Sequence, residues 1–328
     1  MAVSPAAFSL AALPTPLRRA DRLERALGAR PIYVKRDDLT GFGVAGNKAR
    51  KLEHLVADAL RRGCDVLVTG GGPGSNHCHA AAAAARVAGL RCVLVLYGQE
   101  PAAPPTNLAL ARWWGASVSF TGESDRSSVD RGLLEAGARL EAEGAVPYVV
   151  PRGGATPVGS IGYARAAEEL AVQLSGHEVS RATVVVATGS GGTQAGLVAG
   201  NVALGRPWRV VGASVSRGPE ECRRRVLALA QGCAEATVAG GAEDGDVEVV
   251  DARGPGYGIP SAAGEHAATV AAATEGLLLD PVFTAKAFAA FLELVGDVGG
   301  AAVFVHTGGL PAALGQRTGR SRDELVAR

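Results

Sequence analysis

Three segments of the sequence combine residue types that could act together in chemistry. In "GFGVAGNKARKLEHLVADAL", Lys48 follows Gly46 and Asn47 at the expected start of a helix. A neutral lysine amine in such a place can form an imine with a carbonyl compound. Most lysines are solvated, so the other two segments decide whether Lys48 is a functional residue.

The segment "ATGSGGTQAG", residues 187–196, indicates an anion site. It follows a short apolar strand and opens a helix, so its small residues let several backbone N–H groups converge at a helix N-terminus. The spacing is not GxxxxGK[ST], and no acidic residue follows on a clear next strand as a dinucleotide site requires. A single phosphate fits best, although such loops are often only turns.

The segment "VTGGGPGSNHCHA", residues 68–80, is a second strand, glycine turn and helix start. Ser75 and Asn76 lie where amide and hydroxyl groups could hold a carboxylate or a phenolate oxygen; the alternative is a tight turn with an N-cap. His77 and His79 are two apart in a stretch that reads as helix, so they face different ways and we expect no metal site. Together the three segments suggest a phosphate site, a carboxylate site and a reactive amine.

The elements that must position these groups alternate along the chain. Short β-branched runs followed by helical stretches predict parallel sheets. One set of runs is "DVLVTG", "RCVLVLYG", "SVSF" and "VPYVV", and a second is "ATVVVATG", "RVVGASVS" and "AAVFVHTGG". Two sets predict two α/β domains with a ligand cleft between them.

The helix after Lys48 is expected to carry an apolar stripe that includes Leu52, Leu55 and Val56 on one face. Asn47 is the expected N-cap, which places Lys48 in the first turn and pointing away from the stripe. Lys51, one turn further on, could be only a surface charge.

Composition excludes several classes of function. The chain has 328 residues, 47% of them apolar, and a net charge of +1, so no basic surface is expected to bind nucleic acid. Apolar runs are broken by Arg86 and Arg91 before they reach a bilayer-spanning length, and we expect no membrane partner. The cysteines, at 64, 78, 92, 222 and 233, lack CxxC spacing and are expected to be free thiols. The N-terminus lacks a charged start before its apolar part, so we expect a cytoplasmic protein.

Seven segments occur in a family-specific order. They are "KRDD", "GNKARKLE", "GGPGSNH", "TGSGGTQAG", "GYGIP", "DPVFTAKA" and "HTGG", spread over residues 35–309. In this the chain resembles the pyridoxal-phosphate enzymes of the 1-aminocyclopropane-1-carboxylate deaminase and D-cysteine desulfhydrase family. The resemblance implies a fold type II enzyme with pyridoxal 5'-phosphate bound in a cleft between two open, twisted, mostly parallel α/β sheets. Residues 46–160 would form the smaller domain, and residues 1–45 with 161–328 the larger, cofactor-binding domain; we also expect a homodimer.

The resemblance also implies roles for individual residues. Lys48 would be the Schiff-base lysine and the base that takes the Cα proton, and Ser75, Asn76 and His77 would hold the substrate carboxylate and the cofactor's 3-oxygen. Tyr257 and Phe283 would lie beside the substrate. The residues expected to hold the rest of the cofactor are Gly189, Ser190, Gly191, Gly192 and Thr193 at the phosphate, and Thr284 or Thr307 at the pyridine nitrogen.

Two positions depart from the deaminases of the family, which resemble "DPVYEGK" where this chain has "DPVFTAK". A glutamate beside the pyridine nitrogen makes the ring a deep electron sink, which opening of a cyclopropane demands, and Thr284 supplies no such charge. A hydroxyl there suits loss of a β-substituent, as in the desulfhydrases. Phe283 in place of tyrosine is either conservative packing or a change of substrate.

We therefore expect a lyase that catalyses α,β-elimination on a small β-substituted amino acid such as D-cysteine. Lys48, Ser75, Tyr257 and Phe283 would act on the substrate, and pyruvate, ammonia and the β-substituent, a sulfide or thiol, would be released. The alternatives are deamination of 1-aminocyclopropane-1-carboxylate and a protein that binds pyridoxal phosphate or an amino acid without turnover.

Overall fold

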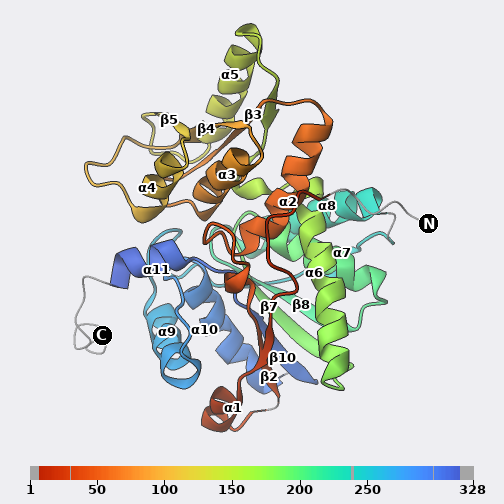
Figure 1. The fold of residues 1–328 in the computed structure, drawn as a ribbon. Helices are drawn as coiled ribbons and strands as arrows, with labels where there is room; N and C mark the ends of the chain where they lie inside the picture. Colours follow the sequence, from red (N-terminus) through yellow and green to blue (C-terminus); the bar gives the residue numbers. More distant parts are fainter. Residues whose placement is uncertain (1–6, 30, 238–239, 298, 318–328) are drawn as a thin grey trace.

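The computed structural model describes residues 7–317, apart from residues 30, 238, 239 and 298. Within them the chain forms a six-stranded and a four-stranded sheet, both flanked by helices (Figure 1). Apart from one antiparallel pair, β1 with β2, the strand pairs are parallel. The predicted fold class, two mostly parallel α/β sheets, is confirmed.

The bounds of the elements follow. The strands are β1 Leu17–Arg19, β2 Ile32–Lys35, β3 Val66–Gly71, β4 Arg91–Leu96, β5 Ser117–Phe120, β6 Pro147–Val149, β7 Ala182–Thr188, β8 Trp208–Ser214, β9 Glu248–Asp251 and β10 Ala301–Val305. The α-helices are α1 Asp21–Leu27, α2 Asn47–Arg61, α3 Asn76–Val87, α4 Thr106–Trp113, α5 Ser128–Ala142, α6 Pro157–Gly176, α7 Gly192–Ala203, α8 Pro219–Thr237, α9 Ala262–Glu275, α10 Thr284–Leu294 and α11 Leu310–Arg317. Short 3₁₀ helices are η1 Asp37–Leu39, η2 Arg152–Gly154, η3 Asp244–Asp246 and η4 Val295–Asp297.

The larger sheet has the strand order β1-β2-β10-β7-β8-β9. Apolar residues of α6, α7 and α8 pack against one face, and those of α1, α9 and α10 against the other. Figure 1 shows α6 and α7 on the opposite side of this sheet from α9 and α10. Because both faces are covered, every residue of β7 is buried, which explains its unbroken run of small and β-branched residues.

The smaller sheet has the strand order β5-β4-β3-β6. Helices α2, α3 and α4 share an apolar cluster with one face, and α5 packs on the other through Val129, Leu133 and Leu140. All four strands lie between Val66 and Val149 in the chain, whereas the larger sheet combines strands from both ends. The exact domain boundaries stay a prediction. Within the described part of the chain, no helix is long and apolar enough to cross a bilayer.

The turn into α2 is shaped by contact with a distant segment. Gly46 has φ of 55°, and a Cβ there would lie 2.3 Å from the Thr307 carbonyl oxygen. The Asn47 backbone N–H donates to that same oxygen at 2.9 Å, so α2 begins at Asn47 and Gly46 is its N-cap. The prediction that Asn47 is the N-cap is wrong, because its amide side chain is engaged elsewhere.

A buried network of charged residues ties α2 to the larger sheet. Arg50 bonds to Asp37 through Nε at 2.9 Å, and to Glu169 of α6 through Nη2 at 2.9 Å. Lys35, at the end of β2, forms an ion pair with the same Glu169. The Arg50 and Asp37 side chains are 1% and 0% exposed. We call these four residues the buried ion network; it fixes the helix that begins beside Lys48.

Candidate active site

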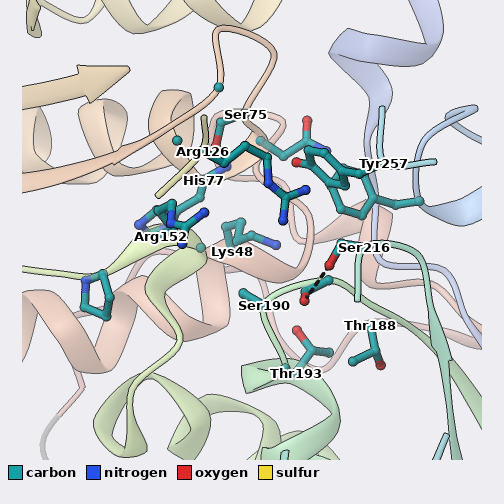
Figure 2. Close-up of a pocket in the computed structure, with 18 of the residues that line it drawn as sticks. Lys48, Ser75, His77, Arg126, Arg152, Thr188, Ser190, Thr193, Ser216 and Tyr257 are labelled. Atoms are coloured by element: carbon teal, nitrogen blue, oxygen red, sulfur yellow. Dashed lines mark hydrogen bonds between the residues drawn. The ribbon is translucent and has the colours of Figure 1, made fainter. Parts of the chain in front are cut away.

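A cavity of about 530 Å³ lies where strands of both sheets reach their carboxyl ends (Figure 2). Its wall includes the ends of β3 and β7 and the segments that follow β4, β8 and β10, the usual position of a ligand site in parallel sheets. The structure brings most of the predicted site residues to this cavity. They are Lys48, Ser75, Asn76, His77, Gly189, Ser190, Gly191, Thr193, Tyr257, Phe283 and Thr307.

Lys48 reaches the cavity from the first turn of α2. Burial lowers the pKa of its amine to about 8, and the Asp280 carboxylate partly opposes that shift. A pKa near 8 keeps a useful fraction of the amine unprotonated at neutral pH, which nucleophilic attack on a carbonyl group requires.

Asn47 positions this lysine. Its Oδ1 accepts a hydrogen bond from Lys48 Nζ at 2.8 Å, and its Nδ2 donates to Thr193 Oγ1 at 2.9 Å. Since Thr193 belongs to the first turn of α7, Asn47 connects the start of α2 to the start of α7. The amine and the glycine-rich loop are thereby held in a fixed relation.

The glycine-rich loop before α7 has the features of an anion site. Gly191 has φ of 96°, a left-handed conformation that favours glycine. Arg217 Nη1 donates to the Gly189 carbonyl at 2.6 Å, and Arg225 Nε donates to the Ser190 carbonyl at 2.9 Å. With these carbonyl oxygens engaged, the N–H groups at the start of α7 are the part of the loop left to bind an anion.

Lys51 provides the observation that tests whether a phosphate fits. Its side chain is fully buried and its Nζ donates to the Gly153 carbonyl at 2.6 Å. A Cβ on Gly192 would lie 2.8 Å from this Nζ, so the amine sits at the start of α7. Among the described residues, no carboxylate lies within ion-pair distance of it. The interpretation of Lys51 as only a surface charge is wrong.

Such an arrangement is unfavourable for the protein by itself. Burial, with the charges of Lys48 and Arg225, lowers the pKa of Lys51 well below its ordinary value. A cation at the positive end of a helix dipole is stabilised when an anion binds between them. A phosphate bound between the loop and Lys51 would therefore relieve the cost of burying this amine at the start of α7.

Ser75 and Asn76 form the opposite end of the site. Ser75 is the N-cap of α3, and its Oγ accepts from the backbone N–H groups of His77 and Cys78 at 3.2 and 3.3 Å. Asn76 Oδ1 accepts from Asn107 Nδ2 at 2.9 Å. The Ser75 hydroxyl hydrogen and the Asn76 amide hydrogens are then donors suited to a carboxylate.

His77 lies in the first turn of α3. Its Nε2 is 3.0 Å from Thr69 Oγ1, which itself donates to the Val150 carbonyl at 2.8 Å. Nε2 must therefore carry the proton. Burial and the nearby Lys51 and Lys48 amines lower the pKa of His77 well below its ordinary value, so the ring is neutral. No cluster of potential metal ligands occurs in the described residues.

An aromatic wall closes another side. The Tyr257 and Phe283 rings meet edge-on with centroids 6.0 Å apart. Burial and Tyr97 raise the pKa of Tyr257 to about 12, so its phenol is protonated at neutral pH. Lys286 Nζ supports this wall by donating to the carbonyls of Arg253 and Gly256 at 2.7 and 2.8 Å.

Two predicted site residues do not line the cavity. Thr284 is fully buried and its Oγ1 donates to Asp280 Oδ2 at 2.7 Å. Asp280 also accepts from the N–H groups of Val282, Phe283 and Thr284, and this turn draws the Thr284 hydroxyl away from the cavity. Gly192 is not among the lining residues, and a Cβ on it would meet Lys51 Nζ. Asp280 itself lines the cavity, in the segment that was assigned to Thr284.

Sequence analysis missed several lining residues: Tyr97, Arg126, Asp130, Arg152, Arg217, Arg225 and Asp280. For Arg152 a signal existed, because it stands before two glycines and one residue after the strand "VPYVV". Asp280 is the first residue of the quoted segment "DPVFTAKA", but it was given no role. The remaining residues stand in no recognisable motif, and only the folded chain brings them to the cavity.

Comparisons with known proteins identify the family. Residues 8–308 match the family of pyridoxal-phosphate dependent enzymes. A protein of Pyrococcus abyssi (strain GE5 / Orsay), provisionally named a 1-aminocyclopropane-1-carboxylate deaminase, is 41% identical over 305 residues, which cover 90% of this chain and 89% of that protein. The D-cysteine desulfhydrase of Yersinia enterocolitica is 40% identical over 310 residues, covering 91% and 92%.

A solved structure agrees with these relatives. The crystal structure of an ACC deaminase homologue superposes with a TM-score of 0.87 at 36% identity, covering 94% of this chain and 93% of that one. Because the family match spans most of the chain and the site accommodates a phosphate beside a reactive lysine, the chain belongs to the pyridoxal-phosphate dependent enzymes, with pyridoxal 5'-phosphate as its cofactor.

Proposed function

We propose that this enzyme is a lyase that catalyses α,β-elimination on a small β-substituted amino acid. The observation that carries the proposal is Lys48, an amine of pKa about 8 held by Asn47 between an anion loop and a pair of carboxylate donors. Relatives at about 40% identity include D-cysteine desulfhydrases, which supports an amino acid with a sulfur substituent as the substrate.

The cofactor would be held by its phosphate at the loop of residues 189–193 and Lys51, and by Lys48. When bound, it withdraws electrons from the Cα of the amino acid and so makes the Cα proton acidic. The remaining tasks belong to the chain's own residues.

Ser75 and Asn76 would bind the substrate carboxylate and orient the Cα–H bond toward Lys48. The Lys48 amine would take the Cα proton, and the Tyr257 phenol would donate a hydrogen bond to the departing group. The Cα–H and Cβ–substituent bonds break, a carbon–carbon double bond forms, and the substituent leaves with its electron pair. Water then converts the unsaturated amino acid to pyruvate and ammonium, with no oxidant or reductant.

A second candidate is deamination of 1-aminocyclopropane-1-carboxylate. Asp280 favours it, because this carboxylate lines the cavity where sequence analysis expected only a neutral threonine. The Pyrococcus abyssi relative bears the corresponding name.

Keto-acid release separates the candidates. The purified holoenzyme would be supplied with D- and L-cysteine, D- and L-β-chloroalanine and 1-aminocyclopropane-1-carboxylate. We expect pyruvate from at least one β-substituted amino acid and no 2-oxobutanoate from the cyclopropane. Robust 2-oxobutanoate would establish the deaminase, and an amino-acid-induced change in the cofactor absorption band without any keto acid would favour a non-catalytic binder. A cytoplasmic location and a homodimer stay predictions.

A further inference from the structure

Arg126 is a cation in the cavity wall that the proposed chemistry does not use. It lies between β5 and α5, is half-buried and lines the cavity. Among the described residues, no carboxylate lies within ion-pair distance of its guanidinium. The neighbouring Asp125 instead bonds back to Ser127. An arginine left without an anion at a cavity wall is available to bind one from outside the protein.

Arg152 in the same wall shows the contrast. Its Nε and Nη2 bond to the two carboxylate oxygens of Asp130 at 2.9 and 2.7 Å. That pair is internally neutral. Arg217 in this wall likewise pairs with Glu221, and Arg225, which has no ion pair, donates to the Ser190 carbonyl. Among the described residues, Arg126 is therefore the wall arginine that has neither an ion pair nor a hydrogen bond.

Arg126 is nevertheless held in place. Its guanidinium lies over the Tyr257 ring, 4.3 Å from the centroid, a cation–π contact that fixes the plane and uses none of the N–H donors. Figure 2 shows the Arg126 side chain reaching into the cavity beside Tyr257, on the side away from Thr193. Its donors are thus directed to the side of the cavity formed by the aromatic wall.

The rest of the site fixes which part of a ligand meets Arg126. The anion loop with Lys51 suits the cofactor phosphate, and Ser75 with Asn76 suits the substrate carboxylate. The substrate's β-substituent is then left to face Tyr257, Phe283 and Arg126. This assignment rests on the proposed function.

We propose that Arg126 selects amino acids whose β-substituent carries a fixed negative charge, such as a sulfonate or a phosphate ester. Planar guanidinium groups bind such oxyanions through two parallel hydrogen bonds. A sulfonate would leave as sulfite and a phosphate ester as phosphate, each with the electron pair of the bond to Cβ. Phe283 brings no polar group to this wall, so its polar groups are the Arg126 guanidinium and the Tyr257 phenol, of which only the guanidinium is charged.

The test compares Arg126→Met with Arg131→Met. Arg131 carries the same charge on α5, pairs with Glu123 and does not line the cavity, so its substitution is a matched control. Cysteate and O-phosphoserine are the anionic probes and β-chloroalanine the neutral one, each as both enantiomers. We expect Arg126→Met to lower kcat/KM for an anionic probe by about 10- to 100-fold, mainly through KM, and for β-chloroalanine by less than about 3-fold. Arg131→Met should leave kcat/KM unchanged for the anionic probes and for β-chloroalanine.

Equal losses on anionic and neutral probes would overturn the inference while leaving the elimination itself established. If no probe yields keto acid, the proposed function fails, and Arg126 is then judged by binding alone. In that case cysteate and alanine would be titrated against the cofactor absorption band of the holoenzyme. A dissociation constant for cysteate that does not rise in Arg126→Met would overturn the inference.

Discussion

Two groups of buried or half-buried cations in this protein meet opposite surroundings. In the buried ion network, Arg50 and Lys35 are matched by the carboxylates of Asp37 and Glu169. Around the cavity, Lys51 has a backbone carbonyl as its bonding partner and Arg126 an aromatic ring. The positive charges of the first group are thus matched by carboxylates of the chain itself, without any ligand.

This difference separates structure from function on electrostatic grounds. A buried cation is costly unless an anion or several acceptors replace its lost hydration. Where the chain supplies the anion, the charges hold helices and strands together; where it does not, the anion comes from a bound molecule. Substitutions in the buried ion network should therefore mainly lower stability, and substitutions of the cavity cations should mainly lower ligand binding or activity.

Lys48→Ala should abolish both the visible absorption band of the cofactor and keto-acid release, because no other amine shares its position at the start of α2. The thermal midpoint of the apo-protein should stay close to that of the parent. Within the described residues, the Lys48 side chain loses only its hydrogen bond to the neighbouring Asn47. Absorption spectra before and after borohydride treatment provide the measurement. A mutant that keeps the band would move the anchor to another lysine.

Asp37→Asn should destabilise the protein by about 3 to 5 kcal/mol, because it leaves the Arg50 guanidinium buried with one carboxylate fewer. Burial alone would raise the pKa of Asp37, but Arg50, Thr15 and Tyr163 hold it below its ordinary value. Urea unfolding monitored by circular dichroism measures the loss. Asp65→Asn, which breaks an exposed pair with Arg91, is the matched control and should have a much smaller effect.

Lys51→Met should weaken pyridoxal phosphate binding by about 10- to 100-fold, because it removes the buried charge at the start of α7. In contrast to Asp37→Asn, it should lower the free energy of unfolding of the apo-protein by no more than about 1 kcal/mol, since no ion pair is lost. Cofactor titration and urea unfolding of the same preparation give both values. Unchanged affinity would place the phosphate elsewhere.

The pH dependence of cofactor capture should reveal the lowered pKa of Lys48. The unprotonated amine reacts, and burial lowers the pKa of Lys48 to about 8, so capture by the apo-protein should rise about tenfold from pH 7 to 9 and then level off. The reference is capture by Nα-acetyl-lysine, whose pKa near 10.4 gives about a hundredfold rise over the same range without a plateau. Identical pH profiles would mean that the pKa of Lys48 is not lowered in the protein.

Much of this arrangement could be predicted from local sequence, because period and turn residues are local properties. The runs "DVLVTG" and "ATVVVATG" became β3 and β7, and the glycines beside Lys48 and Thr193 marked two walls of the cavity. Strands β1, β2 and β9 were not predicted, because runs of only three or four residues are too short to give a clear periodic signal.

Burial was the quantity that local sequence could not provide. Lys51 reads as a solvated helix residue until Gly153 and Gly192 enclose it, and Thr284 reads as a cavity residue until Asp280 engages its hydroxyl. Thr284 is turned by a residue only four positions before it, whereas the outcome for Lys51 depends on segments far away in the chain. The same holds for Arg126, whose position over Tyr257 joins segments from different sheets.

The strand order also governs what a chain can do while it is being synthesised. The smaller sheet is complete once Val149 has left the ribosome, whereas the larger sheet places β10, Ala301–Val305, between β2 and β7. Domains form as their segments emerge, at roughly 5 to 20 residues per second. A nascent chain therefore carries Lys48 through the synthesis of residues 49–306 without Thr307 and Gly308, which pack against Gly46 and line the cavity. The reactive amine therefore meets a finished pocket only after Thr307 and Gly308 have emerged, and a chain that stops before them lacks part of the wall around the aldehyde cofactor.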